Sequence, residues 1–437
     1  MTVAGFIRQQ RYQHELRSRL AGYAQEIHRE KRLGQQLRLW NVQWRQISRQ
    51  IPYWKELCVR RGLPSEFKSW DEFREQVPVM TRADVRSHGV AMSNSSRPAD
   101  FHRKTGGTTA QPVQMPAWND ENRVTLPDVW VARDWYGVRP AARVFMIWGH
   151  SHLLGTGVKG WISARVREIK DGLLGYYRFS AYDLGIEALK HAASEIIKFQ
   201  PDVVYGYSVA LDLLARANRD LRDRLRNLGV KVVIGAAEGF PSAGSESLLA
   251  DMFGCPVAME YGSVETHLMA HSHPRGGYGV FWHNYLLEVE TAAGSRQGRV
   301  RVTSLYPRCF PLVRYELGDE IELPDDDATS FGISRFKRVV GRCNDYVLLD
   351  GDVRIHSEAF THVVRGISVV DGYQVVQTGS DLKLLLLTRA ARSAEIEQEI
   401  RSGLAKIHPL LDRVQIQRVS ALRQTVAGKT PMVMRAQ

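Results

Sequence analysis

Between residues 144 and 253, short apolar runs alternate with longer amphipathic stretches, and this alternation restricts the possible fold more than any other feature of the chain. The apolar runs are VFMIW at 144–148, PDVVYGY at 201–207 and KVVIGAAEGF at 231–240. Helical patterns follow at 184–200, 208–229 and 245–254. Strands that alternate with helices usually pair in parallel, because each helix crosses back over the sheet. The pattern therefore predicts an α/β core with a mostly parallel sheet.

The sequence on either side of this core has a different texture. Residues 1–90 have helical patterns throughout and are predicted to form an N-terminal helical segment, with Thr81 placed to cap a short helix. From about residue 280, short strands separated by turns at Gly294 and Gly298 predict an antiparallel, β-rich subdomain. Residues 341–437 repeat the mixture on a small scale. We expect a helical segment at 1–90, an α/β core with its β-rich subdomain at 91–340, and a small α+β domain at 341–437.

The chain is basic, with 59 Lys and Arg against 47 Asp and Glu and a formal net charge of +12. Much of the excess lies in the first fifty residues, where arginines alternate with Leu, Tyr and Trp at helical spacing. This spacing favours amphipathic helices with a solvated basic face, and no nucleic-acid-binding signature accompanies it. An acidic protein partner is the alternative use of the charge.

Hydropathy and cysteine spacing indicate a cytoplasmic protein. No stretch approaches the ~18 uncharged apolar residues that a membrane span needs, and residues 1–20 lack the apolar core of a secretory signal. Cys58, Cys255, Cys309 and Cys343 are widely spaced with no CxxC pair, which favours reduced thiols.

The string KTGGTTAQP at 104–112 has no apolar side chain before Ala110. Its two glycines allow close approach of the backbone, and the neighbouring N–H and hydroxyl groups can surround phosphate oxygens. A flexible polar surface loop is the alternative. Two other nucleotide motifs fail or are weak. GKT at 428–430 lacks the glycine that a Walker A sequence needs at Arg423, and GTGVKG at 155–160 does not follow its strand directly.

Four further strings follow the loop in order: EYGSVE at 260–265, RYELGD at 314–319, VGRCNDYVLLDG at 340–351 and AGKTPMVMR at 427–435. With this ordered set the chain resembles the adenylate-forming superfamily, and within it the phenylacetate-CoA ligases and their relatives in capsular polysaccharide biosynthesis. PVMTRADVR at 78–86 is similar to the family segment ahead of the phosphate loop. The resemblance covers about residues 51 to 435. It implies a large N-terminal region around the nucleotide and acid, and a small mobile C-terminal domain.

The resemblance also implies a role for each matched residue. Glu265 would bind Mg²⁺, Asp319 the ribose hydroxyls, and Lys429 the reacting carboxylate and α-phosphate. Arg342 would help to place ribose or phosphate, and Asn344 or Asp345 would form the hinge. The remaining implied ATP-binding residues are Lys104, Thr105, Gly106, Gly107, Thr108 and Thr109 at the phosphates, and Ala236, Ala237, Glu238, Tyr261, Gly262 and Ser263 around the adenine.

The sequence departs from the family pattern at two motifs, the phosphate loop and the segment around Lys429. The glycine that usually follows the Thr pair is Ala110, which keeps the loop's donors but stiffens it. Lys429 lies in an unusual context, AGKTPMVMRAQ, after which the sequence ends. This second departure puts ordinary thiolation geometry in question.

A histidine-rich segment follows EYGSVE. His267, His271, His273 and His283 lie in it, and related ligases often carry a structural zinc there. Tetrahedral zinc accepts imidazole ligands, whereas histidines in a polar turn are the simpler interpretation. Both are kept as hypotheses.

The acid pocket is expected at the strand ends around WGHSHLLGTG and VYGYS, because ligands of open α/β sheets bind there. Trp148, His150, Tyr205 and Tyr207 would suit an aromatic or polar-substituted acid, unless they only pack the core. The predicted enzyme is an ATP-dependent ligase that forms an acyl-AMP and passes the acyl group to CoA. Transfer to the phosphopantetheine of an acidic carrier protein, or to an amine, is the alternative within this class. A catalytically idle assembly or surface-binding protein is the alternative outside it, and a homodimer is compatible with either.

Overall fold

The computed structural model describes residues 3–24, 28–104, 114–148, 157–181, 186–237, 239–240, 244–327, 329–342, 346–349, 353–364, 367, 369–388, 394–424 and 430–436. The chain forms two compact units. Residues 1–13, 133–260 and 344–437 make up the first, called here the parallel-sheet unit. Residues 14–132 and 261–343 make up the second, the antiparallel unit.

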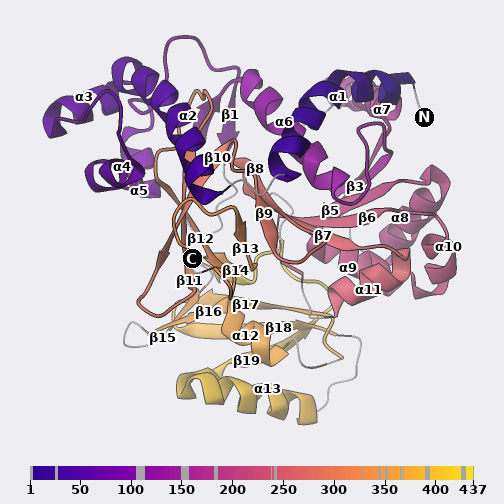
Figure 1. Ribbon diagram of the computed structural model, residues 1–437. Helices are drawn as coiled ribbons and strands as arrows, with labels where there is room; N and C mark the ends of the chain where they lie inside the picture. The colour runs from indigo at the N-terminus through magenta and orange to yellow at the C-terminus, as the bar shows by residue number, and fades with distance from the viewer. Residues whose placement is uncertain are drawn as a thin grey trace. The chain divides into compact units, whose positions relative to one another are not determined.

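The predicted parallel sheet is confirmed in the parallel-sheet unit (Figure 1). Its strand order is β7-β6-β5-β3-β4. The strands are β3 (Val144–Trp148), β4 (Tyr176–Ser180), β5 (Val203–Tyr207), β6 (Val232–Ala236) and β7 (Val257–Ser263). Every residue of β6 is buried, as expected for an apolar strand with neighbours on both sides.

Helices α7 (Gly157–Leu174), α8 (Ile186–Phe199), α9 (Ser208–Ala217), α10 (Arg222–Arg226) and α11 (Ser245–Phe253) connect these strands. Apolar residues of α8, α9 and α11 form one buried cluster with Phe145, Ile147, Val204 and Val233. These four strand residues share one face of the sheet by the period-2 alternation of β-strands. Tyr207 belongs to the same buried cluster, and the partly buried Trp148 packs against it.

The C-terminal part of this unit has a core of its own. A hairpin of β15 (Tyr346–Leu349) and β16 (Val353–His356) leads into α12 (Ser357–Val364). A sheet of order β19-β18-β17-β20 follows, formed by β17 (Gly372–Thr378), β18 (Asp381–Leu387), β19 (Gln415–Val419) and β20 (Val433–Ala436). Helices α12 and α13 (Ala394–Ile407) lie beside this sheet (Figure 1). Phe360, Ile400 and Leu404 from these helices share a buried cluster with apolar residues of the sheet. The α+β mixture predicted for this segment is confirmed.

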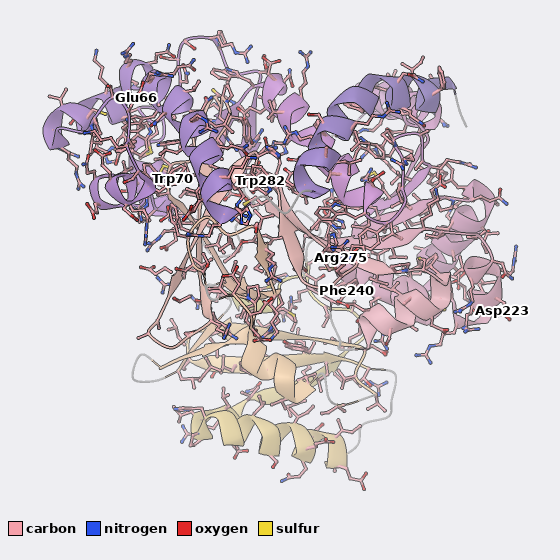
Figure 2. The ribbon with its side chains drawn as sticks, in the orientation of Figure 1. Glu66, Trp70, Asp223, Phe240, Arg275 and Trp282 are labelled. Carbon is pink, nitrogen blue, oxygen red and sulfur yellow. The ribbon has the colours of Figure 1, made fainter. Side chains whose placement is uncertain are left out.

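The antiparallel unit begins with helices whose ends the sequence marks clearly. They are the end of α1 (Val3–Ala24), α2 (Arg29–Gln50), α3 (Pro52–Arg61), α4 (Trp70–Gln76) and α5 (Arg82–His88), with α6 (Asn119–Asp134) beginning later. Thr81 caps α5 as predicted, in a reciprocal capping box with Asp84. Pro52 starts α3, and Gly62 ends it in the left-handed conformation. Trp70 packs edge-on against Phe73 at the start of α4 (Figure 2).

Antiparallel sheets make up the rest of this unit. One has the order β10-β11-β12-β14, formed by β10 (Tyr285–Thr291), β11 (Gln297–Ser304), β12 (Tyr315–Glu322) and β14 (Arg338–Arg342). A second chain of pairings joins β8 (His267–Ser272), β9 (Tyr278–Val280) and β13 (Arg335–Phe336). The β-rich character predicted for the segment after about residue 280 is confirmed, and antiparallel pairing already begins with β8.

The basic N-terminal helices are only partly a solvated face, which corrects the sequence interpretation. Arg32 in α2 is 6% exposed, and its Nη2 donates to the carbonyl oxygen of Gly332 at 2.8 Å. Arg29 donates in the same way to Phe331. Part of the basic excess therefore fastens α2 to the segment around Phe331 and Gly332 of the same unit. Among the described helices, none combines the length and the apolar character that crossing a bilayer requires.

Candidate active site

Tyr261 and Asp319, predicted from two separate motifs, are in direct contact. The Tyr261 hydroxyl donates to Oδ2 of Asp319 at 3.2 Å, and the two residues are 5% and 7% exposed. Tyr261 lies near the end of β7 and packs edge-on against Phe336 of β13. Asp319 lies in β12, opposite Arg342 of β14 in the antiparallel register. The backbone thus brings Asp319 and Arg342 to neighbouring strands, and the Tyr261 side chain reaches Asp319 from β7 of another sheet.

Gly262 and Ser263 build the turn between β7 and β8. A Cβ atom at Gly262 would lie 2.1 Å from the carbonyl oxygen of His267, so only glycine fits there. The Ser263 backbone N–H donates to the Thr266 hydroxyl at 3.0 Å, and the Thr266 N–H donates to the Ser263 hydroxyl at 3.2 Å. These bonds close the turn that presents Glu265.

Glu265 is almost completely buried, with 3% of its side chain exposed. Its Oε1 lies 3.6 Å from Nη2 of Arg82 and makes no hydrogen bond. Tyr315 lies beside the same arginine, and burial followed by the charge of Glu265 raises the pKa of its hydroxyl. The phenol therefore stays neutral, and Oε1 of Glu265 has Arg82 as an ion-pair partner without a hydrogen bond.

Arg103 and Arg308 hold the backbone of Glu265, and the motifs did not reveal them. Nη1 of Arg103 donates to the Glu265 carbonyl oxygen at 3.4 Å, and Nη2 of Arg308 donates to the same oxygen. Glu121 of α6 pairs with both guanidinium groups, at 2.9 Å from Arg103 and 3.7 Å from Arg308. The sequence could have indicated two of these arginines as site residues, because Arg103 directly precedes the phosphate loop and Arg82 lies in the motif PVMTRADVR. Glu121 and Arg308 had none.

The phosphate loop itself lies largely outside the described residues. Strand β1 (Phe101–Lys104) ends at Lys104, which pairs with Gln114 at the start of β2 (Gln114–Ala117). Thr105, Gly106, Gly107, Thr108 and Thr109 fall between the two strands and outside the described ranges, as do His150, Glu238 and Lys429.

Ala236 and Ala237 lie at the end of β6. Ala236 is 3% exposed, and Ala237 has a φ of 71°, a left-handed conformation that is uncommon for a residue with a side chain. One strand position earlier, a Cβ at Gly235 would lie 2.9 Å from the ring tip of Phe240. The chain is therefore tightly packed where it leaves β6, at the segment predicted to frame the adenine.

Trp148, Tyr205 and Tyr207 form an aromatic face on the parallel sheet. The Trp148 ring stacks on Tyr205 with centroids 5.2 Å apart and contacts Tyr207 at 4.3 Å. Tyr207 is buried, whereas Trp148 and Tyr205 are only partly buried. The structure therefore brings together three of the four residues predicted for the acid pocket.

Glu260 adds a carboxylate to this aromatic face, and sequence reasoning missed it. The Tyr205 hydroxyl donates to Oε2 of Glu260 at 3.0 Å. Burial raises the pKa of the Glu260 carboxyl, opposed by the charge of Arg133 and by the Tyr205 hydroxyl. Glu260 is the first residue of the EYGSVE motif, directly before Tyr261, but the motif suggested no role for it.

The four histidines do not form a metal site in the described parts of the chain, where no group of three or more His, Cys, Asp or Glu could hold an ion. Nδ1 of His271 lies 2.8 Å from the Ser272 carbonyl oxygen, and His273 accepts from the Arg275 N–H at 3.1 Å. His283 stacks on Trp282 with centroids 3.8 Å apart. Burial lowers the pKa of His267 to about 3, with Arg103 and Arg308 adding to the effect. The zinc hypothesis gains no support.

Comparisons with known proteins bear on the fold. No family model matches the sequence. The chain is similar to 2-hydroxyisobutyryl-CoA ligase in complex with an acyl-AMP, at a TM-score of 0.67 and 17% identity over 93% of this chain and 89% of that one. The chain has the fold of the adenylate-forming CoA ligases.

Two further structures similar to this chain are named as a CoA ligase and as an amide bond synthetase. Anthranilate CoA ligase AuaEII in complex with anthranoyl-AMP matches at a TM-score of 0.51 and 16% identity, over 75% of this chain and 65% of that one. The amide bond synthetase McbA from Marinactinospora thermotolerans matches at a TM-score of 0.51 and 15% identity, over 73% and 65%.

In sequence, the chain is 23% identical to protein CapK of Staphylococcus aureus over 281 residues. The matched region is 62% of this chain and 59% of CapK.

Proposed function

We propose that the protein activates a carboxylic acid with ATP, forming an acyl-AMP and pyrophosphate, and then transfers the acyl group to CoA. The observation that carries the proposal is the buried contact between Tyr261 and Asp319, 58 residues apart in the sequence. The adenylate-forming sequence motifs assign both residues to the nucleoside. A carboxylate has enough lone pairs to accept from both ribose hydroxyls, and a tyrosine ring offers a flat apolar surface to a base.

In the proposed first step, a carboxylate oxygen attacks the α-phosphorus of ATP. The bond from this phosphorus to the bridging oxygen breaks, and pyrophosphate leaves. Lys104 and residues 105–109 would hold the departing phosphates with backbone N–H and hydroxyl donors. Lys429 would hold the acid and the α-phosphate in line.

Mg²⁺ fits the environment of Glu265. One Oε1 is buried and makes no hydrogen bond, and Mg²⁺ commonly binds one or two carboxylates together with substrate phosphates. When bound, the ion would neutralise phosphate charge. Nη2 of Arg82 lies 3.6 Å from this oxygen and is its partner in an ion pair.

The aromatic face formed by Trp148, Tyr205 and Tyr207 supports an aromatic or polar-substituted acid as the substrate. Stacked rings favour a planar group, because aromatic pairs gain about 0.5–1.5 kcal/mol beyond their buried area. Glu260 and the Tyr205 hydroxyl would favour an acid that carries a hydrogen-bonding substituent. His150 is proposed for the same pocket.

In the second step, the thiol sulfur of CoA would attack the acyl carbon, AMP would leave, and the thiol proton would pass to solvent. The CoA ligases among the structural relatives support this acceptor, whereas McbA supports an amine. A carrier-protein phosphopantetheine uses the same thiol chemistry as CoA. We propose residues 341–437 as the mobile domain that serves both steps.

A panel of carboxylic acids in an ATP–pyrophosphate exchange assay tests the proposal. We expect exchange with one class of acid, and its loss in Asp319→Ala and Lys429→Ala. Hydroxylamine trapping then shows the acyl-AMP, and CoA, carrier protein and amines compete as acceptors. If no acid stimulates exchange, while the folded protein binds acidic polymers equally well with and without these substitutions, the chain is an idle relative.

A further inference from the structure

The cluster of Arg103, Glu121 and Arg308 is one of the most deeply buried charged groups among the described residues. The three side chains are 5%, 1% and 1% exposed. They come from β1, α6 and the segment between β11 and β12. Two guanidinium groups share one carboxylate, so the cluster carries one surplus positive charge. Burial and the charge of Arg308 lower the pKa of Arg103, and Glu121 opposes the shift.

Such a cluster is poorly explained by stability alone. Charges taken out of water lose much of their solvation, and well-packed apolar side chains often stabilise a core as well or better. Here the carboxylate is also fixed in place, because Oε1 of Glu121 accepts from the backbone N–H of Trp118 and of Cys309, each at 3.0 Å. Its role is to orient the two arginines.

Both arginines are oriented toward one atom, the carbonyl oxygen of Glu265. Arg103 is 162 positions from Glu265 in the sequence, and Arg308 is 43 positions from it. Arg308 is held further by its own contacts, as Nε donates to the Phe310 carbonyl at 3.1 Å and Nη1 to the Tyr306 hydroxyl at 2.9 Å.

The next carbonyl of the turn is held as well, since the Tyr285 hydroxyl donates to the carbonyl oxygen of Thr266. Thr266 itself is completely buried and bonded to Ser263. The backbone on either side of the Glu265 side chain is therefore fixed by donors from distant segments. Only the carboxylate of this residue retains an unbonded oxygen.

We propose that Arg308, together with Arg103 and their shared partner Glu121, positions Glu265 for the metal–nucleotide complex by clamping its backbone carbonyl. The proposal rests on the proposed function, because it assigns Glu265 to the metal of MgATP. Arg308 is a positioning residue and need not touch substrate. Groups that hold a metal ligand in place typically affect metal affinity by about 10–100-fold when removed.

Calorimetric titration of the full chain with ATP, in Mg²⁺ and in EDTA, tests this role without depending on turnover. We expect Arg308→Met to weaken binding of MgATP by about 10-fold or more and to leave binding of metal-free ATP unchanged. Arg308→Lys, which keeps a donor near the carbonyl, should restore part of the Mg²⁺-dependent gain. Melting temperatures are measured on the same samples.

Arg32→Met is the matched control. Arg32 is also buried, in the same unit, and also donates to a backbone carbonyl, that of Gly332 at 2.8 Å. We expect it to lower the melting temperature without changing the ratio of MgATP to ATP affinity. Equal ratios in the wild type, Arg308→Met and Arg32→Met would overturn the positioning role.

The failure of the proposed function gives a different result. If the wild-type protein binds neither MgATP nor ATP, the proposed function is wrong, and the positioning role is overturned with it. Where Arg308→Met does not fold, Arg308→Gln replaces it, because the amide keeps a polar partner for Glu121 in the buried cluster and brings no guanidinium group to the Glu265 carbonyl oxygen. An undiminished Mg²⁺-dependent gain in that variant contradicts the proposal.

Discussion

The candidate site residues of the two units, each taken by itself, differ in how their charges are held. In the antiparallel unit, Arg103, Glu121 and Arg308 are buried almost completely and hold backbone. In the parallel-sheet unit, Glu260 is partly exposed and takes its hydrogen bond from Tyr205, a neutral side chain on a partly buried aromatic face. A buried ionic cluster tolerates little change, whereas a half-open aromatic face can be altered without loss of the fold. On the proposed function, the comparison assigns nucleotide binding to a rigid, buried cluster and the choice of acid to a lining that can be replaced.

Removal of one buried charge should give the largest effect. Glu121→Gln leaves two guanidinium groups without their carboxylate, and we expect a loss of about 3–5 kcal/mol in the free energy of unfolding, measured by urea denaturation. Asp251→Asn is the matched control, because Asp251 also lies between two arginines, Arg222 and Arg226, but is 49% exposed. It should cost less than about 1 kcal/mol. Equal losses would contradict the proposed difference.

The next effect should appear in ATP binding. Asp319→Ala removes the carboxylate that accepts from Tyr261, and hydrogen bonds to a charged group contribute about 1.5–3 kcal/mol. We therefore expect MgATP to bind about 10–100-fold more weakly in calorimetry, with the order of preferred acids unchanged. Tyr261→Phe, which keeps the ring, should have the smaller effect. A changed acid preference in Asp319→Ala would break the separation of the two regions.

Tyr205→Phe tests the other side of the comparison. It removes the hydroxyl that donates to Glu260 and keeps the ring that stacks on Trp148. We expect kcat/KM to change by about 10-fold between acids with and without a polar substituent, since about 1.4 kcal/mol corresponds to this factor. MgATP affinity should stay at the wild-type value. A uniform loss for all acids would instead indicate a structural role.

The smallest effect should be a pH dependence near Trp282. Burial, followed by the charge of Arg19, lowers the pKa of His283 from 6.5 to about 4, so the folded state favours neutral imidazole. Its stabilising contribution is complete above pH 6.5 and is lost as the pH falls toward 4. Tyr23, which packs against His283, and Asp128, which pairs with Arg19, are the other titratable groups at this contact.

His283→Gln should remove this acid sensitivity. As the pH falls from 6.5 to 4, we expect the free energy of unfolding of the variant to increase relative to that of the wild type. Urea denaturation at several pH values measures this difference. A constant difference across this range would show that His283 does not titrate there. Asp128 is present in both proteins, so its own titration largely cancels from the difference.

The sequence predicted the scaffold well where local patterns carry it. VFMIW at 144–148 is β3, and the residues of RYELGD from Tyr315 onward begin β12, because strand periodicity and turn residues act over a few neighbours. Thr81 and Asp84 marked the start of α5 for the same reason. Tyr261 and Asp319 could be predicted separately, but only the fold shows their contact.

The Arg103, Glu121 and Arg308 cluster could not be predicted in this way. Its bonds join segments up to 188 residues apart, and no pattern around Glu121 or Arg308 differs from an ordinary surface charge. The histidine segment was misjudged for a related reason. His271 lies in β8, where it is completely buried beside a backbone carbonyl, and not in a polar turn.

Strand β7 carries one residue from each side of this comparison. Glu260 and Tyr261 are consecutive, and consecutive side chains of a strand point to opposite faces. Glu260 bonds to Tyr205, and Tyr261 bonds to Asp319. Substitutions along β7 can therefore alter one contact at a time during divergence of the family. A single-residue deletion before Glu260 would turn every later side chain of the strand to the opposite face. We therefore expect selection against changes in the length of this strand and tolerance of amino-acid substitutions within it.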